Sequence, residues 1–177
     1  MEAVAHFILV HASNKCARNL IFNRDFPTAL LTSGGGDNSG SLLSYDPSNN
    51  QTTVLLRNLT FASGVAVSGD GSFVLVSEYF ANRIRRVWLK GPKAYSSDLF
   101  MLLVGRPDNI KRNSRGQFWI AVNSVLGLGV RVTENGIVLQ IVSLEEYGAE
   151  VASEVQEYNG TLYGGSLLAS YAIIFTP

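Results

Sequence analysis

Short apolar segments alternate with polar turns along the chain, and the pattern recurs about every 45 residues. In the clearest unit, residues 107–122, an Asp-Asn pair leads into a strand, a polar turn follows and a second strand returns. The same order occurs at residues 63–76 and 153–163. The three units share a set of aligned positions: Val65, Ile110 and Val155 in the first strand, Gly71, Gly116 and Gly160 at the turn, and Phe73, Phe118 and Leu162 after it.

The other predicted strands complete the same architecture. Residues 41–45 and 52–56 form a hairpin around Pro47, which favours a turn, and residues 83–89 and 98–104 form two further strands. A repeat of about 45 residues with some four short strands is typical of a β-propeller blade. We therefore predict an all-β fold, a β-propeller of which about three to four blades are present. A β-sandwich of similar hairpins is the alternative, and the common register of the units argues against it.

The first part of the chain is less regular than the rest. Residues 1–36 show no dominant period and stay unassigned, whereas residues 37–177 form the predicted propeller region. The glycines at 34–36 are not followed by Lys-Ser or Lys-Thr, so we expect no phosphate-binding loop there. The apolar stretch 4–12 is too short to cross a bilayer and lacks the basic start of a signal peptide. We therefore expect no transmembrane segment and recognise no signal peptide.

Composition narrows the classes of partner. Lys and Arg number 14 and match the 14 Asp and Glu, so no net positive charge favours binding to nucleic acid. A hydrophobic content of 46% with 17 glycines suits a compact β-protein with many tight turns. Cys16 is the single cysteine, which excludes an intrachain disulfide. We interpret it as a small, partly buried hydrophobic residue. His6 and His11 have no acidic or cysteine companion at ligand spacing, so we expect no metal there.

Five segments carry a resemblance to a known family: residues 40–47, 61–66, 71–78, 86–93 and 107–119. Together they resemble the strictosidine synthase-like family of plants, from residue 37 to about residue 175. The resemblance implies a six-bladed propeller related to paraoxonase and gluconolactonase-type hydrolases, with a small-molecule site at the central tunnel. It also implies the secretory or vacuolar route of the family.

The resemblance places two catalytic positions of the true synthase on this chain. That enzyme joins tryptamine to secologanin by a Pictet–Spengler condensation, with a glutamate as acid–base group and a histidine two residues before it. Matching through Gln156–Glu157 and Gly160 puts these positions at Ser153 and Val151. A serine hydroxyl with no base beside it cannot take a proton from an ammonium group near neutral pH. We therefore expect no condensing activity.

Two functions remain as hypotheses. The first is hydrolase-like activity on small esters or lactones, with Asp108 and Glu154 as weak catalytic candidates. Glu154 is adjacent to the expected position, but one residue along a strand turns a side chain to the opposite face unless a β-bulge intervenes. The second is a propeller fragment without catalysis, which would act as a binding module.

The resemblance also implies a set of tunnel residues. Asp108 and Asn109 match the position where related propellers present an Asp-Asn pair to calcium, and Ser63 and Ser153 hold the matching places in the neighbouring units. We expect these four residues to line the tunnel. Asp108 and Asn109 are candidates for Ca²⁺, which takes oxygen ligands. The alternative is that the pair caps the start of a strand through bonds to backbone groups.

Several surface features complete the predictions. Sequons begin at Asn50, Asn58 and Asn159, in or beside turns as glycosylation requires. Trp88 and Trp119 lie within strand patterns and are expected to pack between blades. A local basic cluster is predicted to be a solvated rim: Arg83, Arg85, Arg86, Lys90 and Lys93.

Overall fold

The computed structural model describes residues 7–11, 38–147 and 151–175, the first range as backbone alone. Within these residues the strands form four antiparallel sheets. The first sheet consists of β1 (Phe7–His11), β2 (Gly40–Asp46) and β3 (Gln51–Leu59). The second consists of β4 (Ala62–Val67), β5 (Phe73–Glu78), β6 (Arg83–Trp88) and β7 (Ser97–Leu102).

The remaining two sheets follow in chain order. The third consists of β8 (Arg106–Arg112), β9 (Phe118–Asn123), β10 (Gly127–Val132) and β11 (Val138–Ser143). The fourth consists of β12 (Ala152–Tyr158), β13 (Thr161–Ser166) and β14 (Ile173–Phe175). Two short 3₁₀ turns, η1 (Tyr79–Ala81) and η2 (Glu145–Tyr147), accompany the second and third sheets.

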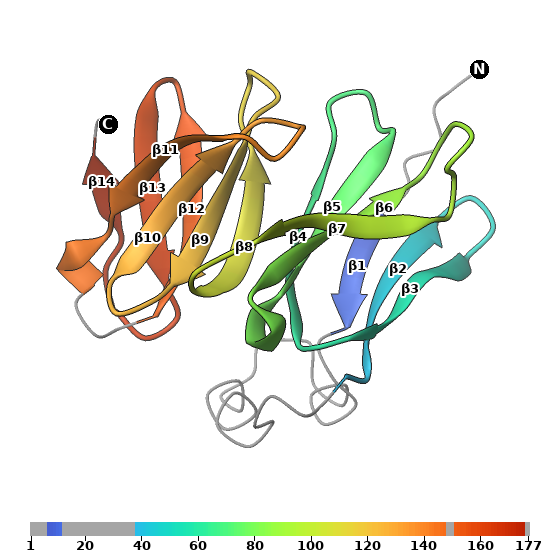
Figure 1. Cartoon of the computed structure of the whole chain (residues 1–177), viewed down its shortest axis with the longest axis horizontal. Helices are drawn as coiled ribbons and strands as arrows, with labels where there is room; N and C mark the ends of the chain where they lie inside the picture. The colour runs from blue at the N-terminus through green and yellow to red at the C-terminus, as the bar shows by residue number, and fades with distance from the viewer. Residues whose placement is uncertain (1–6, 12–37, 148–150, 176–177) are drawn as a thin grey trace.

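The sheets succeed one another across the molecule, from β1–β3 on the right of Figure 1 to β12–β14 on the left. Each sheet is a meander in which sequential strands are neighbours. The first strands of consecutive sheets, β4, β8 and β12, pack against one another and form the inner strands of the assembly. This is the arrangement of successive propeller blades, which confirms the predicted all-β, partial β-propeller fold.

The structure adds strands that the sequence pattern did not reveal: β1, β10, β11 and β14. β1 lies in the unassigned segment 1–36 and pairs antiparallel with β2, from Phe7 opposite Tyr45 to His11 opposite Ser41. The boundary at residue 36 otherwise stays a prediction. Cys16, His6 and the glycines at 34–36 lie outside the described residues.

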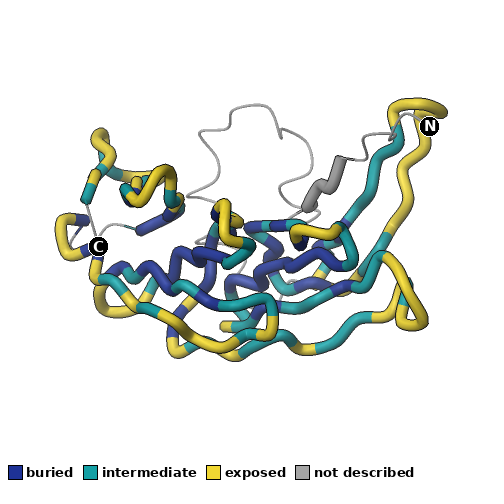
Figure 2. Tube along the Cα trace, turned by 90° about the horizontal axis from the view of Figure 1, so that it is seen from above, coloured by how far each residue is buried: buried dark blue, intermediate teal, exposed yellow. Residues whose placement is uncertain are grey.

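In the two four-stranded sheets, the second strands, β5 and β9, are buried on both faces, which explains their continuous apolar sequences. In β9, Phe118, Ile120 and Val122 belong to a core shared with the second sheet. Trp119 and Ala121 belong to a core shared with the fourth sheet. Buried positions therefore gather between the sheets, and exposed positions gather at the turns around them, as Figure 2 shows.

The same irregularity recurs near the start of all three inner strands. In β4, the register shifts between Ala62 and Val65, so Ser63 and Gly64 form a β-bulge. In β8 the shift falls between Pro107 and Ile110, at Asp108 and Asn109.

The third bulge falls between Ala152 and Glu154 in β12 and leaves Ser153 as the extra residue. The matched polar positions of the sequence repeat are therefore three bulges. Bulges redirect side chains and are common beside functional sites.

Gly64 allows two inner strands to approach closely. A Cβ atom at this position would lie 2.5 Å from the Asp108 carbonyl oxygen and 2.6 Å from the Asn109 Cα. No heavy atom can occupy that space without moving the backbone of β8. Gly64 therefore sets the position of the bulge that carries Asp108.

We predict that Gly64→Ala lowers the free energy of unfolding by about 1–3 kcal/mol, because the added methyl group overpacks a backbone contact. Gly69→Ala is the matched control, since a Cβ there would meet only side-chain atoms at 3.5 Å and 3.7 Å. Urea unfolding of both variants measures the difference. Equal stabilities of the two variants would contradict the account.

Candidate functional site

Asp108 is a buried carboxyl group at the bulge of β8. Its exposed fraction is 5%. Burial, together with the nearby charge of Glu154, raises the pKa of Asp108 from 3.8 to about 7. A carboxyl group with this pKa can give or take a proton near neutral pH.

Glu154 lies beside Asp108 because of the bulge in β12. Burial raises the pKa of Glu154, whereas Lys111 and the Asn109 amide oppose the rise. The Lys111 Nζ lies 3.4 Å from Glu154 Oε2, and Oε1 is buried with no hydrogen-bond partner in the part of the chain that the structure describes. The bulge that the sequence argument required for Glu154 is thus present, and the charge of Glu154 acts on the Asp108 carboxyl group of the neighbouring inner strand.

The serines at the bulges bind backbone groups. The Ser63 hydroxyl donates to the Pro107 carbonyl at 3.1 Å. The Ser77 hydroxyl donates to the Asp108 carbonyl at 2.7 Å and accepts from the Gly64 N–H at 2.6 Å. Sequence analysis missed Ser77, because it lies within the apolar β5. These hydroxyl groups lock β4, β5 and β8 together and position the Asp108 backbone.

Ser153 occupies the matching position of the fourth sheet. It is buried, and its hydroxyl oxygen accepts a hydrogen bond from the Leu167 N–H at 2.9 Å. Ser63, Asp108, Asn109 and Ser153 thus all lie at the bulges of inner strands. Their role as tunnel-lining residues stays a prediction.

A surface depression of about 510 Å³ opens at the end of the sheets where the inner strands begin. Its lining includes Tyr79, Arg106, Asn123 and Val151, the position where the synthase resemblance placed a histidine. Burial raises the pKa of the Tyr79 hydroxyl, Arg106 opposes that effect, and the Asp108 charge adds to it. Tyr79 therefore lines the depression and is also within range of the Asp108 charge.

The oxygen donors near Asp108 match a calcium site only in part. Asp108, Asn109 and Glu154 provide carboxyl and amide oxygens, but Ca²⁺ takes roughly six to eight. Among the described residues, no group of three or more His, Cys, Asp or Glu side chains could hold a metal ion. Calcium at Asp108 and Asn109 thus stays a prediction.

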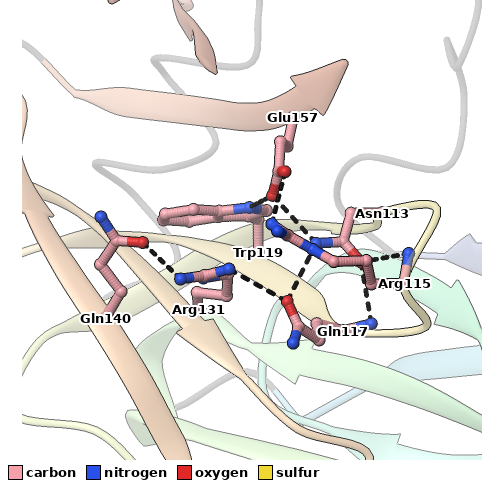
Figure 3. A network of polar contacts seen from close by, with 7 residues as sticks. All are labelled: Asn113, Arg115, Gln117, Trp119, Arg131, Gln140 and Glu157. Carbon is pink, nitrogen blue, oxygen red and sulfur yellow. Dashed lines mark hydrogen bonds and ion pairs between the residues drawn. The ribbon is translucent and has the colours of Figure 1, made fainter. Parts of the chain in front are cut away.

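Glu157 is the centre of a second polar cluster, which links the third and fourth sheets (Figure 3). It accepts hydrogen bonds from Trp119 Nε1 at 2.8 Å, Asn113 Nδ2 at 2.9 Å and Arg115 Nη2 at 2.6 Å. Burial favours a higher pKa of Glu157, but these donors outweigh it and lower the pKa. Trp119 thus packs between blades as predicted, and its N–H group also joins two blades.

The predicted basic rim is largely internally paired. Arg83 Nε lies 2.6 Å from the fully buried Glu78, and Arg86 Nε lies 3.0 Å from Asp98. The Arg86 guanidinium also lies 4.3 Å from the centre of the Trp88 ring. Arg83 and Arg86 are thus held by carboxylates of their own sheet, while their side chains keep exposed fractions of 36% and 19%. The solvated rim stays a prediction, and Lys90 and Lys93 are exposed.

The three sequon asparagines are exposed. Asn50 and Asn159 lie in turns, and Asn58 lies near the end of β3. Exposure is required for glycosylation, which stays a prediction. No helix in the described part of the chain is long and apolar enough to cross a membrane.

Solved structures with the same fold define the class of protein. The chain superposes on a luciferin-regenerating enzyme with a TM-score of 0.60 and 17% identity, over 72% of this chain and 44% of that one. A gluconolactonase from Xanthomonas campestris gives a TM-score of 0.58 and 17% identity, over 72% and 42% of the two chains. At these identities the likeness concerns the fold alone, and that fold is a β-propeller.

Sequence relatives identify the family. The strictosidine synthase family model matches residues 13–92, starting within the segment that the sequence pattern left unassigned. Protein STRICTOSIDINE SYNTHASE-LIKE 12 of Arabidopsis thaliana is 46% identical over 151 residues, which cover 81% of this chain and 45% of the relative. Strictosidine synthase of Catharanthus roseus is 40% identical over 144 residues, 76% of this chain and 41% of that enzyme. The chain belongs to the strictosidine synthase-like family and spans about half the length of these relatives.

We predict that Glu157→Gln lowers the free energy of unfolding by about 1–3 kcal/mol at pH 7, because charge-assisted hydrogen bonds to the carboxylate are lost. The folded-state pKa is lowered, so this stability is present above the unfolded pKa and disappears as pH falls through the folded one. Urea unfolding at pH 7 and at progressively lower pH measures the difference from the parent protein.

The matched control is Glu145→Gln, in an exposed turn. This change should leave stability nearly unaltered at each pH. A destabilisation by Glu157→Gln that stays constant down to strongly acidic pH would rule out the carboxylate as its source.

Proposed function

We propose that this chain forms part of a strictosidine synthase-like propeller that hydrolyses small esters or lactones, with Asp108 and Glu154 as its acid–base pair. The observation that carries the proposal is the buried Asp108, whose pKa of about 7 lies in the working range of a general base. The charge of Glu154 acts on Asp108, and Tyr79, which lines an open depression, is within range of the Asp108 charge. Fold-level likeness to a gluconolactonase supports the reaction class by analogy only.

The residues present favour hydrolysis over condensation. A Pictet–Spengler reaction needs a base for the substrate amine, and the position expected for that glutamate is occupied by Ser153. The Ser153 hydroxyl already accepts a backbone hydrogen bond and has no described base as a partner. Val151 stands where the histidine would be and offers no proton.

The proposed reaction uses the two carboxyl groups in turn. Ionised Asp108 takes a proton from water as the water oxygen bonds to the acyl carbon of the substrate. The bond between the acyl carbon and the leaving oxygen then breaks, and that oxygen receives a proton from the carboxyl pair. One ester and one water molecule become one acid and one alcohol, and a lactone becomes a hydroxy acid.

A non-catalytic binding module is the second candidate function. It is favoured by Ser153 and Val151, which stand where the synthase resemblance places the glutamate and the histidine. Residues from blades outside this chain would complete a propeller site. Vacuolar or secretory localisation and glycosylation at Asn50, Asn58 and Asn159 belong to the same family-based proposal.

Calcium is a further proposal for the same site. Asp108 and Asn109 would contribute oxygens to the ion, and Glu154 is the nearest additional carboxyl group. A bound divalent cation would lower the pKa of both carboxyl groups and could polarise a substrate carbonyl. Regucalcin from Agrobacterium tumefaciens, described as a calcium-binding protein, has the same fold with a TM-score of 0.56 and 15% identity.

We predict that the protein hydrolyses p-nitrophenyl acetate or δ-valerolactone, and that Asp108→Asn lowers kcat/KM by about 100-fold or more. Because the base is the ionised form, the activity should rise with pH and reach half its maximum near a pH of about 7. The assay follows p-nitrophenol release or acid production between acidic and mildly alkaline pH.

Asp70→Asn is the control, since it removes an exposed carboxylate from a turn of the second sheet. It should retain the parent activity. Tryptamine and secologanin supplied together should give no condensation product. Hydrolysis unaffected by Asp108→Asn would reject the acid–base assignment, and condensation above background would reject the distinction from the synthase.

We predict that calcium binds at Asp108 and Asn109, and that it therefore raises the Tm of the parent protein and leaves the Tm of Asp108→Ala unchanged. The measurement is a calcium titration followed by thermal unfolding, with magnesium as the comparison ion. Equal shifts in the parent and the variant would reject this site.

A further inference from the structure

The surface depression contains an arginine with no acidic partner in the described part of the chain. Arg106 begins β8 and is exposed at the residue level. Its guanidinium carbon lies 5.3 Å from the centre of the Phe80 ring and 5.7 Å from that of Tyr79. The two rings orient the charged group without neutralising it.

Asn123 presents a second donor at the same place. It lies directly opposite Arg106 in the pairing of β8 with β9. Side chains of opposite residues in antiparallel strands share a face of the sheet, with Cβ atoms roughly 4.5–5.5 Å apart. Asn123 Nδ2 is buried and has no hydrogen-bond acceptor among residues 38–147 and 151–175. An unsatisfied buried donor is costly, and a ligand oxygen would satisfy it.

The backbone around these donors is fixed. Gly105 packs so closely that a Cβ atom there would lie 2.5 Å from the Asn123 carbonyl oxygen and 2.9 Å from a Val122 methyl carbon. The Arg106–Asn123 pair therefore sits on rigid strands and not on a free loop. Preorganised donors lose little conformational entropy on binding.

Apolar side chains complete the depression. Val104 and Val125 line it and are 94% and 95% exposed. They flank the two donors on the loop before β8 and the turn after β9. Within the described residues, the site thus combines a cation without an acidic partner, an amide N–H group without an acceptor and an apolar rim.

We propose that this depression is a binding subsite for small organic carboxylates with an apolar body, in which Arg106 and Asn123 donate to the carboxylate and Val104 and Val125 contact the body. Arginine is well suited to carboxylates because its planar guanidinium offers two parallel donors. The positive charge of Arg106 would repel a cationic amine, so the subsite disfavours substrates such as tryptamine.

This inference deepens the proposed function and rests on it for biological meaning, because ester or lactone hydrolysis yields a carboxylic acid. Arg106 and Asn123 would hold the acid product, or an acidic group of the substrate, in the depression lined by Tyr79. The binding itself is independent of the chemistry. Asp108→Asn can therefore lose hydrolysis while the subsite still binds a carboxylate.

The test is a titration of the full chain with phenylacetate at pH 6, followed by calorimetry or ligand-observed NMR, with phenylacetamide as the uncharged isostere. We expect phenylacetate to bind more tightly than phenylacetamide. Arg106→Gln should lower the affinity for phenylacetate by about tenfold or more. Arg106→Lys should retain part of the affinity, and Asn123→Ala should weaken binding as well. Arg112→Gln, at the other end of β8, should have no effect.

Val125→Asp is the second variant, in case Arg106→Gln impairs folding. It leaves Arg106 in place and adds a carboxylate to the rim, which should repel phenylacetate but not phenylacetamide. The inference is overturned by equal affinities for phenylacetate and phenylacetamide. It is also overturned by unchanged binding in Arg106→Gln, or by a failure of the parent protein to bind phenylacetate at millimolar concentration.

Discussion

The close approach of inner strands is the constraint on which the rest of the structure depends. Gly64 lets β4 pack against the backbone of Asp108 and Asn109, and the Ser77 hydroxyl closes the contact through a hydrogen bond to the Asp108 carbonyl. Each of the three inner strands carries a bulge near its start. Bulges redirect side chains that a regular strand would send to alternate faces, and the Asp108 and Glu154 side chains come near enough to interact through their charges.

The surroundings of each carboxyl group explain the shift of its pKa. Two carboxyl groups, Asp108 and Glu154, interact where burial disfavours their charged forms, and Lys111 offers a positive charge to Glu154. By contrast, Glu157 is surrounded by donors that favour its charge. The fold therefore contains one carboxyl group with a raised pKa, Asp108, and another with a lowered pKa, Glu157. Asp108 is the candidate for acid–base chemistry, and Glu157 joins the third and fourth sheets.

The sequence predicted the fold well because the repeat is carried by strong local signals. Turn glycines such as Gly116 and alternating apolar positions such as Phe118 and Ile120 identify hairpins without tertiary information. The outer strand β11 was not predicted, because its exposed apolar residues lack a clear buried face. Asp108 was identified from the repeat, whereas Ser77 and the pairing of Arg106 with Asn123 depend on register across strands. No local pattern records that register.

The most direct measurement of the central claim is a carbon-13 NMR titration of the Asp108 carboxyl group in the folded chain. The account predicts a midpoint near the pKa of about 7, which should fall in Glu154→Gln as the neighbouring charge is removed. A midpoint near the ordinary value of 3.8, unaffected by Glu154→Gln, would show that Asp108 is solvated and uncoupled. That result would contradict a buried acid–base pair at the inner strands.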